Sequence, residues 1–522
     1  QMQPVYAGGS SASLSRPAPA KAAPPRPEIR PLVTAAEMFP ALEEMVLDAR
    51  EEILLSFRIF DARTRLRSAA ARDLDLTTWA DLLAHVAAKG LVIRLLLADF
   101  DPVFAPDLHR EAWFSAGRFA ARLTDHPKAE VLCALHDCAP APIWKRAFAL
   151  PIRRRLADLR TRPHETLTPP QLRALQGDYD LRPVTLHQKL AVIDGTRAII
   201  GGIDVDERRW DDDTHDQRPE DTWHDVSMEV AGPVVADIRR HFADCWTRAR
   251  SECGTTFSAR TTPLDLPPVH AMSNAAPRLL RTVSTCAKGP TRFGPETKVR
   301  EHETAHLDAF ARAERSIYAE TQFFRHLPLA RALARRAEEA PELELILVLP
   351  TEPERVIFGH DTGMTARHAQ ALQLRCLTLL RRAFGERMAL VSPAQPRPAP
   401  DGTPLPVAGS GIIYLHSKVT LVDDTTGIVG SANLNGRSLL WDTEASLQVF
   451  DPEVITGLRT RLARKWLGDD AQDIDRAATW TRAAKASETR PPEDRDTMVL
   501  PYPEGRNRRF ARYVPVLPSA MF

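Results

Sequence analysis

The sequence predicts an α/β protein built from two similar lobes, each a mixed β-sheet flanked by helices, with one active site where the lobes meet. Two observations support this prediction. A strand, a helix and a second strand follow one another in both halves of the 522-residue chain. A motif with the same spacing then recurs downstream of each unit. The chain is long enough for more than one hydrophobic core.

The first half begins with a buried strand predicted over residues 52–61 (EILLSFRIFD). Residues 78–89 carry apolar side chains at helical spacing, and Gly90 is a typical helix stop. Residues 91–99 (LVIRLLLAD) form a nearly continuous apolar run, which is typical of a parallel strand covered on both faces. Together they predict a βαβ unit.

The second half repeats this order. A strand is predicted over residues 315–324, a helix over 329–339 and an apolar strand over 343–349. We therefore expect a flexible leader (1–31), an N-terminal lobe (32–255), a linker (256–276), a C-terminal lobe (277–480) and a tail packed on the lobes (481–522). Two Pro-bearing stretches, 139–182 and 393–406, are interpreted as insertions or loops near the site.

The repeated motif follows the pattern H-x-K, four residues, D, six residues, G-[GS]-x-[DN]. The first copy runs from His187 to Asp204 and the second from His416 to Asn433. A lone H-x-K carries no weight, but two full copies in halves of like architecture are a strong signal. Residues i and i+2 of a strand share a face, so each His should lie beside its Lys.

This arrangement suits the displacement of a phosphodiester. Lys189 and Lys418 would hold the anionic phosphate, while His187 and His416 would supply a nucleophile and a proton donor from opposite sides. Neither a cofactor nor a metal site is predicted. Each histidine also needs a carboxylate to fix its tautomer, and the candidates are the acids that follow each motif, Asp225 and Glu444.

Other motif residues are assigned supporting roles. The small residues Gly202 and Ser431 would allow close approach to phosphate, and Asn433 can donate to a phosphoryl oxygen. Asp204 occupies the position of Asn433 in the first copy of the motif and is also predicted to contact phosphate. Asp194 and Asp423 lie at odd spacing from each His, on the opposite strand face, and are expected to make structural pairs.

The doubled motif resembles that of the phospholipase D superfamily, and the similarity spans residues 32–466. Three further stretches resemble the true phospholipase D branch: GGID at 201–204 followed by RWD at 209–211, WHD at 223–225, and IYAETQFF at 317–324. Ala319 and Thr321 depart from that branch's pattern, and Asp204 stands where many relatives have Asn. The first and last of these stretches lead us to expect a substrate-lining role for Gln322, Glu320 and Trp210.

The resemblance implies a two-step reaction in which His187 forms a phosphohistidine and His416 protonates the leaving alcohol. The leading function is hydrolysis of a glycerophospholipid to phosphatidic acid and a free alcohol, with transfer to an added alcohol as a variant. The alternatives are a cardiolipin synthase-like phosphatidyltransferase, a nuclease and a non-enzymatic scaffold.

Composition limits these choices. Sixty-nine basic and 68 acidic residues give a net charge of +1, which argues against a protein that binds nucleic acid by bulk charge. No stretch reaches the length of a membrane span, and no signal peptide is visible. We expect a cytoplasmic protein, or one exported without such a signal, that meets its phospholipid substrate at a membrane surface. Oligomeric state is left open.

The basic run at 153–155 and the acidic run at 211–213 are typical of solvated surface, with lipid headgroup contact as the alternative for the basic run.

Overall fold

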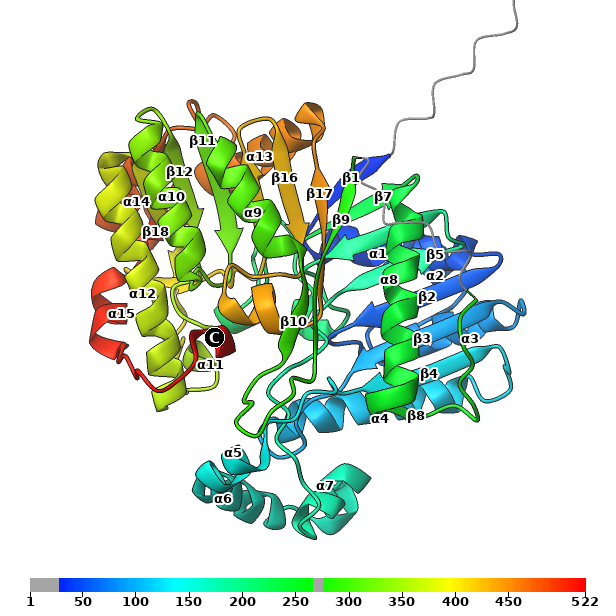
Figure 1. Cartoon of the computed structure of the whole chain (residues 1–522). Coiled ribbons are helices and arrows are strands. Elements are labelled where there is room, and N and C mark those ends of the chain that lie inside the picture. Colours follow the sequence, from blue (N-terminus) through cyan, green and yellow to red (C-terminus); the bar gives the residue numbers. More distant parts are fainter. Residues whose placement is uncertain (1–27, 266–275) are drawn as a thin grey trace, which may run out of the picture.

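The computed structural model describes residues 28–265 and 276–522, and its two lobes lie side by side (Figure 1). The predicted fold class is confirmed. Residues 1–27 of the expected leader and 266–275 of the expected linker lie outside the described residues. The first strand already begins at Ile29, slightly before the predicted start.

The first lobe contains an eight-stranded sheet. In spatial order its strands are β1 (Ile29–Val33), β7 (Val226–Ala231), β6 (Arg197–Gly201), β5 (Leu190–Ile193), β2 (Glu52–Phe57), β3 (Val92–Ala98), β4 (Ala129–Ala134) and β8 (Gly254–Thr256). Its helices are α1 (Ala35–Asp48), α2 (Ala69–Asp73), α3 (Trp79–Ala87), α4 (Pro106–Arg122), α5 (Pro142–Ala147), α6 (Ala149–Arg160), α7 (Pro169–Leu175) and α8 (Val234–Arg248).

The second lobe contains a ten-stranded sheet. Its strands in spatial order are β10 (Glu296–Arg300), β9 (Arg278–Thr285), β17 (Glu444–Val449), β16 (Thr426–Gly430), β15 (Lys418–Val422), β11 (Ser316–Thr321), β12 (Glu344–Val348), β13 (Met388–Pro398) and β14 (Ser410–Ile412), with β18 (Val499–Pro501) also paired to β13. Its helices are α9 (Glu301–Arg312), α10 (Leu327–Glu339), α11 (Glu354–Ile357), α12 (Met364–Phe384), α13 (Pro452–Leu467), α14 (Ala477–Thr489) and α15 (Glu504–Phe510).

Seven strands follow the same order in both sheets. The series β1-β7-β6-β5-β2-β3-β4 corresponds to β9-β17-β16-β15-β11-β12-β13. In each lobe the predicted βαβ unit supplies two parallel strands, β2 with β3 and β11 with β12. The motif strands β5 and β15 pair antiparallel with β2 and β11. The internal repeat of the sequence is therefore a structural repeat.

The helix predicted over 78–89 is α3, and its start has a local cause. The Thr78 side chain accepts from the backbone N–H of Asp81, and the Asp81 carboxylate accepts from the Thr78 N–H, which forms a capping box. Gly90 follows with φ of 80°, a backbone conformation that glycine adopts without strain. Both ends of this helix are thus set by residues visible in the sequence.

One apolar cluster joins the two lobes. It includes Leu54 and Ile200 from the first sheet, Leu421 and Val429 from the second, and Trp466 from α13, all essentially buried. Neighbouring strand residues such as Ile53 and Leu55 point the other way into a separate core under α1 and α3. The faces that meet between the lobes are therefore apolar, and this shared core holds the two halves of the site in register.

One expectation about loops is corrected. The Pro-rich segment 393–406 is not all loop, because β13 continues to Pro398 and pairs with β14 and β18. The expected tail, 481–522, contributes β18 to the second sheet. The insertion at 139–182 forms α5, α6 and α7, which project from the base of the molecule in Figure 1.

Candidate active site

The backbone at the start of each H-x-K motif pairs with a chain segment of the other lobe. The His187 N–H donates to the carbonyl of Thr443 at 2.9 Å, and the His416 N–H donates to the carbonyl of His224 at 2.8 Å. Parallel bridges join Leu186 to Thr443 and His224 to Leu415. The two H-x-K segments are therefore fixed against each other by backbone hydrogen bonds across the lobe interface.

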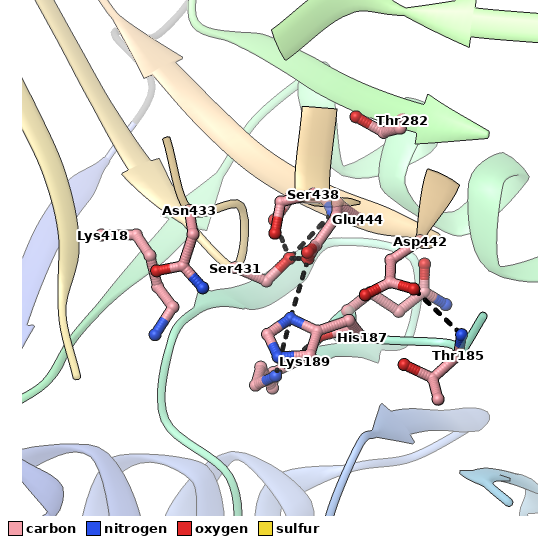
Figure 2. Close-up of polar contacts among 12 residues, drawn as sticks. Thr185, His187, Lys189, Thr282, Lys418, Ser431, Asn433, Ser438, Asp442 and Glu444 are labelled. Atoms are coloured by element: carbon pink, nitrogen blue, oxygen red, sulfur yellow. Dashed lines mark hydrogen bonds and ion pairs between the residues drawn. The ribbon is translucent and has the colours of Figure 1, made fainter. Parts of the chain in front are cut away.

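The orienting carboxylates are exchanged between the lobes. His187 Nδ1 lies 3.1 Å from Glu444 Oε2, and His416 Nδ1 lies 2.6 Å from Asp225 Oδ2 (Figure 2 shows the first pair). Asp225 and Glu444 are buried, at 1% and 0% exposure. With Nδ1 facing a carboxylate, Nε2 of each ring makes no hydrogen bond within the described part of the chain. Each Nε2 is thus the ring atom available for chemistry.

The two lysines lie beside the histidines, as the strand spacing predicts. Lys189 Nζ donates to the carbonyl of His187 at 2.6 Å, and Lys418 Nζ lies 2.9 Å from His416 Nδ1 and contacts the carbonyl of that residue. Their exposures are 1% and 4%. Burial of two ammonium groups is costly in the absence of an anion, so the site is suited to a negatively charged ligand.

Electrostatics link the two half-sites. Burial and the charges of Lys189, Arg58 and Lys418 hold the pKa of His187 well below its usual value. Burial and the charges of Lys418, Lys189, Arg209 and His187 do the same for the pKa of His416. Each imidazole therefore experiences the lysine of the other motif. The free protein holds both rings neutral, and a bound anion would oppose this effect.

The pKa values of the two carboxyl groups are raised, whereas those of the histidines are lowered. Burial raises the pKa of Glu444 to about 8, partly offset by Lys189, and raises the pKa of Asp225 to about 6, partly offset by Lys418. Burial likewise lowers the pKa of Lys418 to about 7. Perturbed groups of both signs gathered around two histidines are a physical mark of a catalytic site.

Gly202 and Ser431 support these carboxylates, whereas we expected them to face phosphate. A Cβ at Gly202 would come within 2.0 Å of Asp225 Oδ1, so only glycine leaves room for that carboxylate. At the equivalent place in the second half, the Ser431 hydroxyl donates to Glu444. Both positions therefore act on a carboxylate that orients a histidine, while their direct contact with phosphate stays a prediction.

Asn433 and Asp204 both lie at the site but differ in environment. Asn433 Nδ2 donates to Gln322 Oε1 at 3.4 Å, and Gln322 Nε2 donates to the Tyr414 hydroxyl at 2.9 Å. Asp204 Oδ2 lies 3.6 Å from Lys189 Nζ, while Oδ1 accepts from the backbone N–H of Ile59. The amide of Asn433 has a second N–H to donate, whereas an ionised Asp204 has no proton to donate to phosphate.

Two residues expected to line the substrate, Glu320 and Trp210, make contacts with other parts of the protein. Glu320 is fully buried and accepts from four side chains: His224, Ser417, Tyr318 and Trp466. Burial opposes ionisation of this acid, but these donors prevail and lower its pKa to about 2. Trp210 packs against Phe39 of α1 and the guanidinium of Arg67. Glu320 holds β11, β15 and α13 together, and Trp210 belongs to the first lobe's core.

Asp194 and Asp423 make matching structural contacts. The Asp194 carboxylate accepts from the backbone N–H groups of residues 50, 51 and 52, and that of Asp423 accepts from residues 314, 315 and 316. Each therefore ties the turn after the motif strand to the start of its neighbour, β2 or β11. This is the structural pairing that the odd spacing predicts.

Within the acidic run at 211–213, Asp212 and Asp213 are exposed as expected of solvated surface, but Asp211 is not. Asp211 is 0% exposed and accepts from His215 Nδ1 at 2.6 Å and from the Trp223 N–H at 2.7 Å. It thereby fixes the segment that carries Asp225. Sequence reasoning also missed Arg58, which follows β2 and contributes to the electrostatics of His187. An alignment of the two halves on Asp194 and Asp423 would have identified Arg58, because it places this arginine opposite Gln322 of the second half.

No group of three or more His, Cys, Asp or Glu side chains suited to a metal ion occurs in residues 28–265 and 276–522. Over the same residues, no helix combines the length and apolar character needed to cross a bilayer.

Comparison with known proteins gives a consistent result. The family model described as "Cardiolipin synthase, PLD-like domain" matches residues 307–466. Phospholipase D1 of Saccharomyces cerevisiae is 25% identical over 383 residues, covering 55% of this chain and 22% of the yeast protein. Cardiolipin synthase A of Pseudomonas entomophila is 23% identical over 298 residues, covering 56% of this chain and 50% of that protein. The chain thus spans half or less of the length of these two relatives.

The fold has a solved counterpart. The crystal structure of phosphatidylserine synthase from Haemophilus influenzae superposes with a TM-score of 0.51 at 13% identity, over 83% of this chain and 84% of that one. It supports the two-lobed architecture alone. The doubled motif, the family model over residues 307–466 and the sequence relatives together show that this chain is similar to members of the phospholipase D superfamily.

Proposed function

We propose that this protein hydrolyses glycerophospholipids to phosphatidic acid and a free headgroup alcohol, as a member of the true phospholipase D branch. The observation that carries the proposal is the pair of imidazoles at the lobe interface, each oriented by a carboxylate from the opposite lobe. The two buried lysines beside them supply the charge that a phosphodiester requires.

The first step is attack on phosphorus. Nε2 of His187 forms a P–N bond while the P–O bond to the headgroup alcohol breaks, and His416 donates its proton to the departing oxygen. Lys189 and Lys418 stabilise the charge on the non-bridging oxygens. A bound phosphate also offsets the two ammonium charges, which raises the pKa of His416 from its depressed value in the free protein and favours its role as an acid.

The second step regenerates the enzyme. His416, now neutral, accepts a proton from water as the water oxygen attacks phosphorus, and the P–N bond breaks to release His187. Replacement of water by an alcohol gives transfer of the phosphatidyl group. The assignment of His187 as nucleophile rests on resemblance to the family, because the two half-sites are alike in geometry.

The test is release of choline and ethanolamine from phosphatidylcholine and phosphatidylethanolamine vesicles, with the wild type beside His187→Ala. We expect release only by the wild type. Equal release by both proteins would contradict the proposal. Circular dichroism of both proteins checks that the variant folds.

The second candidate is a phosphatidyltransferase, which differs only in the acceptor of the second step. The similarity of residues 307–466 to the cardiolipin synthase family model and the similarity to Pseudomonas cardiolipin synthases favour it. Incubation with phosphatidylglycerol separates the two functions: cardiolipin and glycerol indicate transfer, whereas phosphatidic acid and glycerol indicate hydrolysis. A nuclease is disfavoured by the near-zero net charge.

We also propose that the protein meets its lipid at an anionic membrane surface through α5 and α6. Ile143 and Leu150 are 52% and 58% exposed on these short helices, and the exposed basic run at 153–155 follows directly. Exposed apolar side chains beside basic ones suit an anionic bilayer surface.

The test for this contact is co-sedimentation with phosphatidylglycerol vesicles. The double variant Ile143→Ser/Leu150→Ser should bind at least several-fold more weakly than the wild type. Met364→Ser is the matched control, since Met364 is 58% exposed on α12 of the other lobe. Equal binding by all three proteins would rule out this surface.

A further inference from the structure

The two half-sites are not identical, and the structure provides a way to align them. Asp194 and Asp423 make the same contacts, with residues 50–52 and with residues 314–316. Glu52 and Ser316 are therefore equivalent positions at the starts of β2 and β11. Six residues further along each chain segment lie Arg58 in the first half and Gln322 in the second.

The partners of these two residues are also equivalent. Asn433 lies ten residues after Asp423, and Asp204 lies ten residues after Asp194. In the second half-site, Gln322 and Asn433 form a neutral pair of amides joined by a 3.4 Å hydrogen bond. In the first half-site, a guanidinium and a carboxylate occupy the same two places. The formal charge of each pair is zero, but only the first pair contains ions.

Arg58 is partly buried and makes no hydrogen bond or ion pair within residues 28–265 and 276–522, and its Nε atom is shielded from solvent without a partner. Its guanidinium lies 5.1 Å from the ring centroid of Phe100. Burial lowers its pKa and the charge of Asp204 opposes that effect, while Arg209 and Arg437 also lower it. The donors of Arg58 are thus unused in a region crowded with cations.

The negative charge of Asp204 explains why the first half-site contains an additional cation, Arg58. Its Oδ1 is held by the backbone N–H of Ile59, the residue next to Arg58, and its Oδ2 lies 3.6 Å from Lys189 Nζ without a hydrogen bond. A buried carboxylate beside a phosphate repels it, whereas the amide of Asn433 does not. The first half-site therefore needs one more positive charge than the second to bind the same anion.

We propose that Arg58 binds a non-bridging phosphoryl oxygen of the substrate in the first half-site, with Asp204 as the nearby carboxylate whose charge offsets those of Arg58 and Lys189. This inference rests on the proposed function, since it concerns the phosphate in the same site. The planar guanidinium presents several N–H donors in a fixed geometry that suits phosphate oxygens. A phosphate held from this side would also lie near Lys189, because Asp204 accepts from the N–H of Ile59, next to Arg58, and its Oδ2 lies 3.6 Å from Lys189 Nζ.

The experiment compares Arg58→Gln, Asp204→Asn and the double variant Arg58→Gln/Asp204→Asn, which copies the amide pair of the second half-site without changing net charge. Arg63→Gln is the control, because Arg63 is 55% exposed and paired with Asp61 on the surface. Two quantities are measured for each protein: the affinity for inorganic phosphate by calorimetry, and kcat and KM for headgroup release.

We expect Arg58→Gln to weaken phosphate binding at least ten-fold and to lower kcat/KM by about 100-fold, the typical effect of removing one donor to a reacting oxygen. The double variant should recover part of kcat/KM, because the uncompensated carboxylate is gone, but it should still bind phosphate weakly. Asp204→Asn should bind phosphate at least as tightly as the wild type, and Arg63→Gln should match the wild type in both measurements.

Three results would overturn the proposal. Wild-type phosphate affinity in the double variant would mean that Arg58 serves only to neutralise Asp204. Wild-type affinity in Arg58→Gln, or no phosphate binding by the wild type at millimolar concentration, would remove the contact altogether. These outcomes differ from a failure of the proposed function. If the protein cleaved no lipid but still bound phosphate in an Arg58-dependent way, this inference would hold and the proposed function would not.

Discussion

Replacement of Glu444 by glutamine is expected to change both the rate and its dependence on pH. Glu444 is fully buried and its Oε2 atom lies 3.1 Å from His187 Nδ1. As the P–N bond forms, the imidazole gains positive charge. A unit charge about 4 Å away contributes about 4 kcal/mol at an effective dielectric constant of about 20. Glutamine keeps the shape but loses this charge, so the rate should fall by about 10³-fold.

The pH profile gives a sharper expectation. Burial raises the pKa of Glu444 to about 8, so the His187–Glu444 pair carries an extra proton below that pH. That proton must leave before Nε2 can attack, and kcat/KM of the wild type should therefore rise as pH increases towards 8. The amide of the Glu444→Gln variant cannot take up the proton, and the remaining titration of His187 lies well below its usual range.

The two proteins should consequently converge at low pH. Two pH units below a pKa of about 8, the wild type loses about 100-fold, so the gap to Glu444→Gln should shrink from about 10³-fold at pH 8 to about 10-fold at pH 6. The assay is headgroup release between about pH 5 and 9, with thermal unfolding of both proteins as the control for folding. A gap that stays constant with pH, or that is below about 10-fold at pH 8, would refute this reasoning.

Three further changes have defined outcomes. Asp423→Ala leaves three backbone N–H groups without their acceptor and should lower the free energy of unfolding by about 3 kcal/mol in urea titration; a loss below about 1 kcal/mol would contradict that role. Gly202→Ala should cost about 100-fold in activity because its methyl group displaces a catalytic carboxylate, whereas Gly457→Ala, with open space around its Cβ position, should be neutral. His416→Ala, given a p-nitrophenyl phosphodiester that needs no acid, should accumulate a covalent adduct on His187 by mass spectrometry, and an adduct elsewhere would exclude His187 as nucleophile.

Local patterns were sufficient to predict much of the fold. The strand predicted at 91–99 is β3 (Val92–Ala98), and the helix predicted at 329–339 is α10 (Leu327–Glu339). These elements are recognisable because burial on both faces of a parallel sheet demands continuous apolar runs, and because helix ends carry their own capping residues. The proximity of the two H-x-K motifs also follows from the repeat, once both copies are assigned to equivalent strands.

The sequence identified the two acids Asp225 and Glu444, but which of them serves which histidine could not be predicted in the same way. The pairing of His187 with Glu444 depends on a backbone bridge between segments from different lobes, and no periodicity encodes such a contact. The contacts of Glu320 could not be predicted for a related reason. Its sequence neighbours suggest a strand end at a site, but its donors come from His224 in the first lobe and from Trp466 on α13. Distant chain segments decide whether a carboxylate faces a ligand or the core.

The exchange of carboxylates makes the two lobes chemically inseparable. A lobe expressed alone would keep its histidine and lysine but would lose the acid that sets the tautomer of that histidine. An ancestor with a single motif would have needed a second copy of itself to complete even one orienting pair. Duplication and fusion of such a unit would preserve this mutual dependence, and would then leave each copy free to diverge at positions such as Arg58 and Gln322.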